Sequence, residues 1–167
     1  KVDADAMDAL QTAQLSYDGT SSEISYDGIV DAIDIFEEET NTQKVMFIHP
    51  KQMTQLRHDN NFISADKYPG AVVMTGEIGM IANTRIVPSK RVPLNEDETY
   101  YINPIVKIEQ DINSEDETPA LTIYIKRDTN VEAQRESLRR VTDISVDKLY
   151  TVALSNSSKV VLAKFKK

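Results

Sequence analysis

Two histidines have the widest chemical range of the side chains in this sequence, because imidazole binds metals and transfers protons near neutral pH. His49 and His58 are nine positions apart, and the HExxH spacing that places two metal ligands on one helix face does not occur. His49 ends an apolar run and directly precedes Pro50. A structural histidine is therefore the expected interpretation of His49, ahead of a metal ligand.

Acidic residues gather around positions 95–98 and 111–117, where they could supply oxygen ligands for a divalent cation. An EF-hand loop beginning at Asp111 would need glycine at its sixth position and a bidentate glutamate at its twelfth. The sequence has Asp116 and Thr122 at these two positions, so the EF-hand pattern fails. A solvated surface is the simpler interpretation. A hydrolase or nuclease that depends on a carboxylate-bound metal is kept as the alternative function.

Motifs for phosphate binding and for nucleophilic catalysis are missing from the sequence. Gly70, Gly76 and Gly79 are the clustered glycines, but Glu77 stands where a P-loop needs lysine, and neither G-x-G-x-x-G nor G-x-S-x-G occurs. The count of 0 cysteines excludes disulfides, thiol catalysis and Cys-ligated metals. We therefore predict no catalytic residue, no metal site and no cofactor, and expect a protein that is not an enzyme.

Charge is distributed unevenly along the 167 residues. The net charge is −8, and residues 120–167 carry ten basic and five acidic side chains, which leaves −13 for residues 1–119. Such an acidic protein is a poor general nucleic-acid binder, because the phosphates require an excess of cations. An acidic body and a basic C-terminal third could steer copies of the chain together. Chance and solubility are the alternative explanation.

Apolar periodicity and breaking residues predict helices first and strands afterwards. The expected helices cover 3–13, then a stretch with Ser25 as N-cap that Glu37-Glu38-Glu39 close, and 50–57 with Pro50 in the first turn. The expected strands are 44–48 (buried on both faces), two within 76–87 around Ala82-Asn83, 99–108, 121–126, and a terminal pair joined as a hairpin by Asn156-Ser157-Ser158. Residues 16–23 are expected to form a polar break and residues 58–75 a long polar loop. This order predicts one domain of the α+β class.

Membrane association is not expected. No apolar run approaches the 18 residues that a membrane span requires. The N-terminal residues Lys1-Val2-Asp3 lack the apolar stretch of a secretory signal.

The order of the segments resembles the major capsid proteins of tailed bacteriophages and prophages, which share the Hong Kong-type capsid fold. The resemblance covers residues 2–165 and rests on a series of patterns in a fixed order: Tyr26–Ile33 followed by Phe36, Val45–Pro50, Leu56-Arg57, Gly76–Ala82, Ile86–Pro93, Val131–Ala133 through Lys148–Leu154, and Asn156–Phe165. In that family such segments build an axial domain and the strands that return to a peripheral domain.

The resemblance implies the capsid fold, with a mainly axial-type α+β domain over 1–130 and C-terminal strands of the peripheral domain over 131–167. It implies a structural virion protein that self-assembles as pentamers and hexamers into an icosahedral head enclosing DNA. The expected partners are further copies of the chain, with scaffolding protein and portal, and packaged DNA only non-specifically. The expected location is the virion, and the host cytoplasm during assembly. Another virion protein, such as a tail or adaptor protein, is a further alternative.

Members of the family usually begin with an N-terminal arm, an extended loop and a long spine helix. None of these elements fits before Lys1, so we expect a fragment or a trimmed coat protein. Inter-subunit contacts are expected at Lys67 and Tyr68 in the long polar loop, and at Arg139 and Arg140 because of their local charge.

Overall fold

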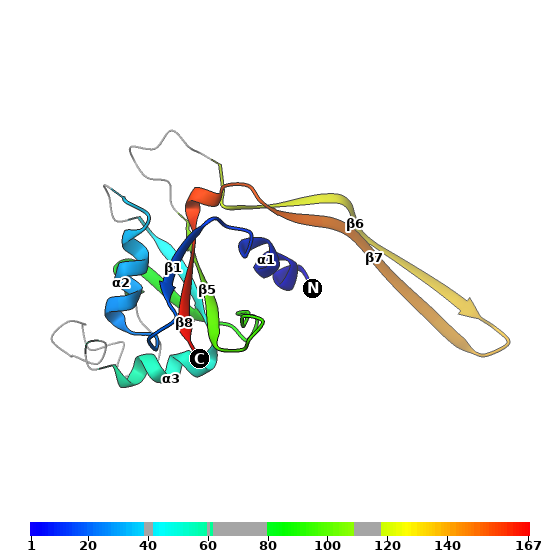
Figure 1. Cartoon of the computed structure of the whole chain (residues 1–167). Helices are drawn as coiled ribbons and strands as arrows, with labels where there is room; N and C mark the ends of the chain where they lie inside the picture. The colour runs from blue at the N-terminus through cyan, green and yellow to red at the C-terminus, as the bar shows by residue number, and fades with distance from the viewer. Residues whose placement is uncertain (39–41, 60, 62–79, 109–117) are drawn as a thin grey trace.

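A computed structural model of the chain describes residues 1–38, 42–59, 61, 80–108 and 118–167. These residues form a body, built around a six-stranded mixed sheet with helices, and a long two-stranded hairpin that projects from the body (Figure 1). Helices and strands are thus combined in one unit, which confirms the predicted α+β class.

The sheet of the body is mixed, with antiparallel strands at its centre. Its strands are β1 (Leu15–Gly19), β2 (Lys44–Ile48), β3 (Met80–Ile81), β4 (Thr84–Pro88), β5 (Tyr100–Lys107) and β8 (Val160–Lys166), in the spatial order β1-β8-β5-β2-β4-β3. β5 runs antiparallel to both β8 and β2, whereas β1 is parallel to β8 and β4 is parallel to β2. Segments from both ends of the chain are therefore held side by side in one sheet.

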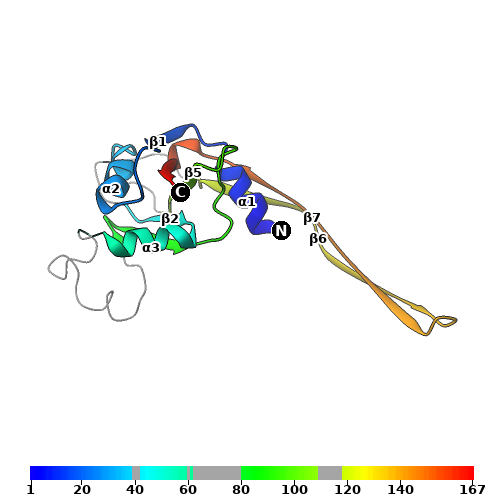
Figure 2. The same cartoon turned by 60° about the horizontal axis from the view of Figure 1, so that its bottom comes forward.

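Helices lie on both faces of the sheet (Figure 2). They are α1 (Val2–Leu10), α2 (Tyr26–Asp34) and α3 (Pro50–His58). Because successive side chains of a strand point to opposite faces, β8 contributes to two cores. Its odd-numbered residues, such as Phe165, pack with α2 and α3, and its even-numbered residues, such as Leu162, pack with Met7 and Leu10 of α1.

The strand at 44–48 forms as predicted, but its two faces differ in burial. Met46 and Ile48 have no exposed surface in the core below α2 and α3. Phe47, on the other face, is only half-buried. The prediction of burial on both faces is therefore wrong for this second face, which α1 covers only in part among the described residues.

His49 has a structural role, as the sequence indicated. It ends β2, and its Nδ1 accepts a hydrogen bond from Lys51 N at 3.3 Å, while Gln52 Oε1 accepts one from His49 N at 3.2 Å. Its ring stacks on Tyr101 with the ring centroids 4.6 Å apart. Burial, together with the charges of Lys51 and Lys90, lowers the pKa of His49. The neutral imidazole thus completes the start of α3.

Residues 15–19 form the edge strand β1, so the polar break predicted over 16–23 is wrong for this part. The backbone of β1 pairs in parallel with β8, and the Tyr17 ring packs near Phe165 with the centroids 5.8 Å apart. Both contacts join residues that are far apart in the sequence. Long-range pairing therefore decides the structure of a segment with little local strand signal.

The segment Asn156-Ser157-Ser158 does not form the predicted hairpin. It begins a 3-10 turn (Ser157–Lys159) in which Asn156 Oδ1 accepts a hydrogen bond from Ser158 N at 3.0 Å. The strand before it, β7 (Val141–Leu154), pairs with β6 (Leu121–Glu136), which extends ten residues beyond the predicted end at Lys126. β8 pairs with β1 and β5 in the body, so β7 forms its hairpin with β6 and not with β8.

The predicted division into 1–130 and 131–167 stays a prediction, and position 131 lies within β6.

Glu38 links two lysines in an almost buried ion-pair cluster. Its carboxylate oxygens lie 2.5 Å from Lys44 Nζ and 2.6 Å from Lys107 Nζ, and one accepts a hydrogen bond from Thr42 Oγ1 at 2.7 Å. The two lysines are directly opposite each other in the β2–β5 register, and Lys44 has no exposed surface. Glu38 therefore holds the segment after α2 against the sheet by neutralising charge between neighbouring strands.

Replacing this carboxylate should destabilise the protein, and the loss should depend on pH. We expect Glu38→Gln to lower the free energy of unfolding by about 3 kcal/mol at neutral pH, because it leaves buried ammonium groups without a counter-charge. Burial raises the pKa of Glu38, but hydrogen bonds from Lys107, Lys44 and Thr42 outweigh it and hold the pKa below its usual value of 4.5. The stability from Glu38 is therefore present above pH 4.5 and is lost as the pH falls through the lower, folded-state pKa.

Urea unfolding measured between neutral and acid pH checks this prediction. Glu23 is exposed, so Glu23→Gln serves as the matched control and should change stability by less than about 0.5 kcal/mol. Equal effects of the two substitutions, or an effect of Glu38→Gln that does not shrink in acid, would contradict the assignment.

The turn between β3 and β4 forms at Ala82-Asn83 as predicted, and it uses left-handed backbone. Ala82 and Asn83 have φ values of 45° and 58°, the arrangement of a type I′ hairpin turn. Alanine tolerates this conformation poorly, whereas glycine adopts it freely. We expect Ala82→Gly to raise the free energy of unfolding by roughly 0.5–1 kcal/mol in urea. Ala6→Gly, within α1, should instead lower it by a similar amount, about 0.5–1 kcal/mol.

Candidate assembly surfaces

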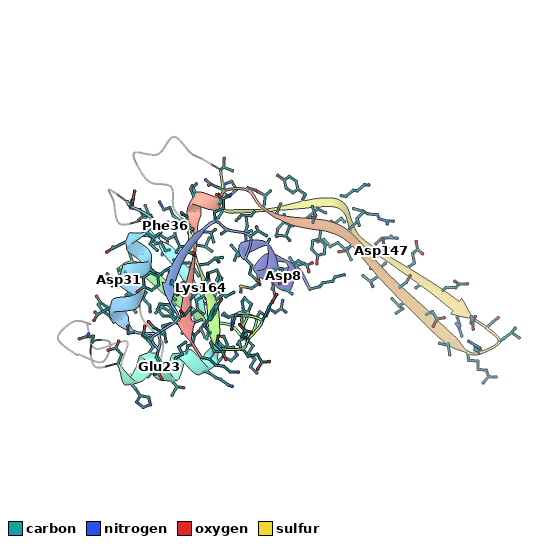
Figure 3. All side chains as sticks on the ribbon, viewed as in Figure 1. Asp8, Glu23, Asp31, Phe36, Asp147 and Lys164 are labelled. Carbon is teal, nitrogen blue, oxygen red and sulfur yellow. The ribbon has the colours of Figure 1, made fainter. Side chains whose placement is uncertain are left out.

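The β6–β7 hairpin carries most of the exposed apolar surface of the described chain. Nine of the twelve large apolar side chains that are exposed among the described residues lie on its strands or in its turn. Figure 3 shows that the side chains of its outer part, around Asp147, have no neighbouring element on either side. A two-stranded hairpin alone in water is only marginally stable. This part of the chain is therefore a candidate contact surface.

The strand register gives the hairpin one apolar face. Both irregularities of the pairing fall in β6, between Ile125 and Asn130, so β7 keeps its alternation of sides along its whole length. We call this surface the apolar hairpin face, and its apolar members are Leu121, Ile123, Ile125, Val131, Ala133, Ile144, Val146, Tyr150, Val152 and Leu154. Lys148, Arg135 and Thr142 share it.

The opposite side of the outer hairpin is acidic. Its residues are Asn130, Glu132, Gln134, Glu136, Val141, Asp143, Ser145 and Asp147, which we call the acidic hairpin face. Arg127, near the body, lies 3.1 Å from Asp147 in an exposed ion pair. In the outer hairpin, apolar side chains therefore predominate on one side and acidic side chains on the other, with Lys148, Arg135 and Val141 as exceptions.

Helix α1 covers the base of the apolar hairpin face and leaves its outer half open. Met7 and Leu10 pack with Leu121 and Leu154, and Tyr150 Oη donates a hydrogen bond to Asp5 Oδ2 at 2.6 Å. Further out, the exposed fractions of Val131, Ile144 and Val146 are 61%, 67% and 62%. The same face is therefore partly covered near α1, where Ile123 and Ile125 are still 50% and 55% exposed, and more open further out.

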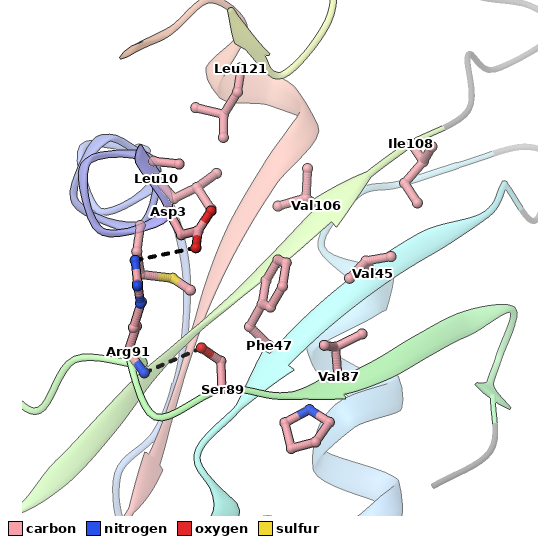
Figure 4. A pocket seen from close by; sticks show the side chains of 13 residues that line it. Asp3, Leu10, Val45, Phe47, Val87, Ser89, Arg91, Val106, Ile108 and Leu121 are labelled. Carbon is pink, nitrogen blue, oxygen red and sulfur yellow. Dashed lines mark hydrogen bonds and ion pairs between the residues drawn. The ribbon is translucent and has the colours of Figure 1, made fainter. Parts of the chain in front are cut away.

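An apolar groove lies beside α1 on the partly covered face of the body sheet (Figure 4). Its volume is about 530 Å³. Its apolar lining comes from α1, β2, β4, β5 and β6 and comprises Ala6, Met7, Leu10, Val45, Phe47, Val87, Pro88, Val106, Ile108 and Leu121. Asp3 and Arg91 stand at its rim as an exposed ion pair of 3.5 Å. The groove offers an apolar side chain a place out of water and contains little that could perform chemistry.

The turn at the end of the hairpin combines an apolar residue with basic residues. Leu138 is 100% exposed, and Arg139 and Arg140 follow it. Arg139 Nε lies 3.7 Å from Glu136 Oε2, and Arg140 has a positive φ of 53°. Both arginines singled out from the sequence are thus at the tip, at the greatest distance from the body.

The other candidate residues fall partly outside the described part of the chain. Lys67, Tyr68 and the acidic stretch 111–117 lie in ranges that the structure does not describe. Glu96, Asp97 and Glu98 are exposed, and within the described ranges no group of three His, Cys, Asp or Glu side chains is arranged to hold a metal. In these same ranges no helix is both long and apolar enough to cross a membrane.

The apolar hairpin face and the groove were not found from the sequence. The face had a local signal, because apolar residues alternate with polar ones at 131 and 133 and again at 144 and 146. No local sequence pattern indicates the groove, since its lining comes from elements that are separated along the chain.

No model of a known protein family matches the chain. The chain is 27% identical over 163 residues to a protein named "Major capsid protein" from Staphylococcus phage phiMR11, an alignment that covers 96% of the chain and 53% of that protein. Among solved structures it matches the capsid of Helicobacter pylori bacteriophage KHP30 with a TM-score of 0.73 and 12% identity, over 99% of the chain and 65% of that chain. It also matches a structure from Mycobacterium phage Che8 with a TM-score of 0.68 and 20% identity, over 97% and 57%.

These likenesses give the chain the fold of phage capsid subunits, which confirms the fold that the resemblance implied. The chain spans about half the length of the curated relative that it matches, 53%.

If the apolar hairpin face is a contact surface, one charge placed on it should weaken self-association. We expect Ile144→Asp to lower the association constant about tenfold or more, since burying such a side chain is worth about 1.5–3 kcal/mol. Ser145→Asp, on the acidic face one residue away, should leave it within about twofold. Sedimentation velocity over a concentration series measures both, and equal effects would contradict the assignment.

Proposed function

We propose that the chain is part of a major capsid protein, a structural subunit that self-assembles into the icosahedral head of a phage or prophage. The observation that carries this proposal is the alignment of 96% of the chain with a protein named "Major capsid protein". The capsid fold over 99% of the chain supports it. By this proposal, the subunit acts through its shape and its contacts with other subunits, and needs no enzymatic chemistry.

The distribution of surfaces supports this function physically. A closed shell is made of many copies, and each contact between copies repeats by symmetry. A subunit of this kind needs apolar surfaces that stay open until a neighbour covers them. The outer part of the apolar hairpin face and the groove beside α1 are such surfaces. Contacts between subunits, by this proposal, include Arg139 and Arg140 at the tip, and Lys67 and Tyr68, which lie outside the described residues.

The partners and the location follow as parts of the same proposal. Copies of the subunit form pentamers and hexamers, with scaffolding protein and portal as further partners. The net charge of −8 disfavours strong phosphate binding, so packaged DNA is contacted only non-specifically. The protein resides in the virion, after assembly in the host cytoplasm.

Electron microscopy of the complete product of the reading frame, produced with its neighbouring genes, tests the proposal. We expect closed shells or capsomers for the unaltered protein and for Ser145→Asp, and a marked loss of particles for Ile144→Asp. Rings or tubes of fixed diameter would favour a tail or adaptor protein. Uniform small particles that bind Mg²⁺ tightly in isothermal titration would favour the metal-dependent hydrolase. Either of these two results would overturn the capsid function.

A further inference from the structure

Two carboxamide side chains lie fully buried in the core of the body without a complete set of hydrogen bonds. Asn103 of β5 and Gln52 of α3 both have an exposed fraction of 0%. Among the described residues, neither Nδ2 nor Oδ1 of Asn103 has a hydrogen-bond partner, and Gln52 Nε2 also lacks one. A buried amide without a partner costs free energy, so native proteins nearly always supply one from the chain or from ordered water. These three atoms therefore indicate a polar site inside the core.

The sheet surrounds Asn103 with apolar neighbours. Its side chain lies on the face under α2 and α3, because Ile105, two residues further along β5, packs in that core. The small side chain of Ala163 is directly opposite Asn103 in the β5–β8 register. On the other side of β5, Met46 is opposite Ile105, so Ile48 comes beside Asn103 two residues further on. Neither neighbour has a polar side-chain atom, so the sheet offers the Asn103 amide no partner.

Helix α3 brings Gln52 to the same part of the core. The ring of its N-cap residue, His49, stacks on Tyr101 with the centroids 4.6 Å apart. Tyr101 precedes Asn103 by two residues in β5, so both side chains lie on the same face of the sheet. Gln52 Oε1 accepts a hydrogen bond from His49 N at 3.2 Å, which holds the Gln52 carboxamide beside this end of the helix. That bond uses the oxygen and leaves Nε2 as the donor that needs an acceptor.

A direct bond between the two amides would satisfy only part of them. Gln52 Nε2 could donate to Asn103 Oδ1, but Asn103 Nδ2 would still need an acceptor, and its neighbours on the sheet are apolar. Water both donates and accepts, and a buried water typically forms about three hydrogen bonds. It also joins polar groups that are too far apart to bond directly. Water is therefore the ligand whose chemistry matches this set of donors and acceptor.

We propose that Gln52 and Asn103 hold one or two bound waters between α3 and the sheet. Water accepts a hydrogen bond from Gln52 Nε2 and donates one to Asn103 Oδ1, and Asn103 Nδ2 donates to the same water or to a second one. This hydration site joins the first turn of α3 to β5 through the core. It concerns the body alone and does not rest on the proposed function, so its failure would leave that function intact.

A structure of the complete protein at a resolution that shows ordered water tests the site directly. We expect density for a water at a hydrogen-bond distance of about 2.7–3.2 Å from both Asn103 Oδ1 and Gln52 Nε2. A direct bond between the two amides, or a core without water at this place, would overturn the proposal. A hydrogen bond to the Asn103 amide from a residue outside the described ranges would overturn it as well.

Urea unfolding of Asn103→Leu separates a hydrated amide from one without any partner. Leucine has nearly the same shape as asparagine but cannot bind water. We expect the substitution to raise the unfolding equilibrium constant about tenfold, because it removes hydrogen bonds and leaves Gln52 Nε2 without its acceptor. If the Asn103 amide had no partner, leucine would instead lower the unfolding constant, since it would remove a buried polar group from the core. That result would contradict the proposal.

A double-mutant cycle tests whether the two amides share one site. Gln52→Met removes the second amide at nearly constant shape, together with its bond to His49 N. Combined with Asn103→Leu, we expect a loss of stability about threefold to tenfold smaller, in the unfolding constant, than the product of the two single losses. Gln14 is exposed, so Gln14→Met is the matched control, and its effect should simply multiply with that of Asn103→Leu. Simple multiplication for Gln52→Met as well would exclude a shared site.

Discussion

The whole body depends on the central position of β8. This strand comes last in the sequence, yet it pairs with β1 on one side and with β5 on the other. Five of its seven residues are buried hydrophobics, and they alternate between the core under α2 and α3 and the core under α1. Both cores include residues of β8, so neither layer of helices has a complete surface to pack on without this strand.

Helix α1 connects the body and the hairpin. One side of it packs on the sheet through Met7 and Leu10, and these residues also touch the base of the hairpin. The hydrogen bond from Tyr150 to Asp5 fixes the hairpin to the helix at a second point. Within the described residues, the groove lies on one side of α1 and the outer apolar hairpin face on the other.

Local sequence patterns were sufficient to predict the parts of the fold that local interactions determine. Ser25 and the His49-Pro50 pair mark the starts of their helices, and Ala82-Asn83 marks its turn, because capping and turn formation involve neighbouring residues. Strand partners were not predictable in this way. Residues 15–19 form the strand β1 because they pair with β8. The hairpin consists of β6 and β7 because β8 pairs with β1 and β5 in the body. The arginines of the tip were identified from charge alone, whereas the groove depends on elements brought together by the fold.

The position of the pairing irregularities in β6 has a consequence for how the hairpin is aimed. Both lie between Ile125 and Asn130, while the ladder on either side is regular. A bulged strand bends locally, and the torsion angles of a few residues set the direction of everything beyond them. The short stretch between Ile125 and Asn130 therefore sets the direction of the outer ribbon, while the apolar and acidic sides stay separate along β7.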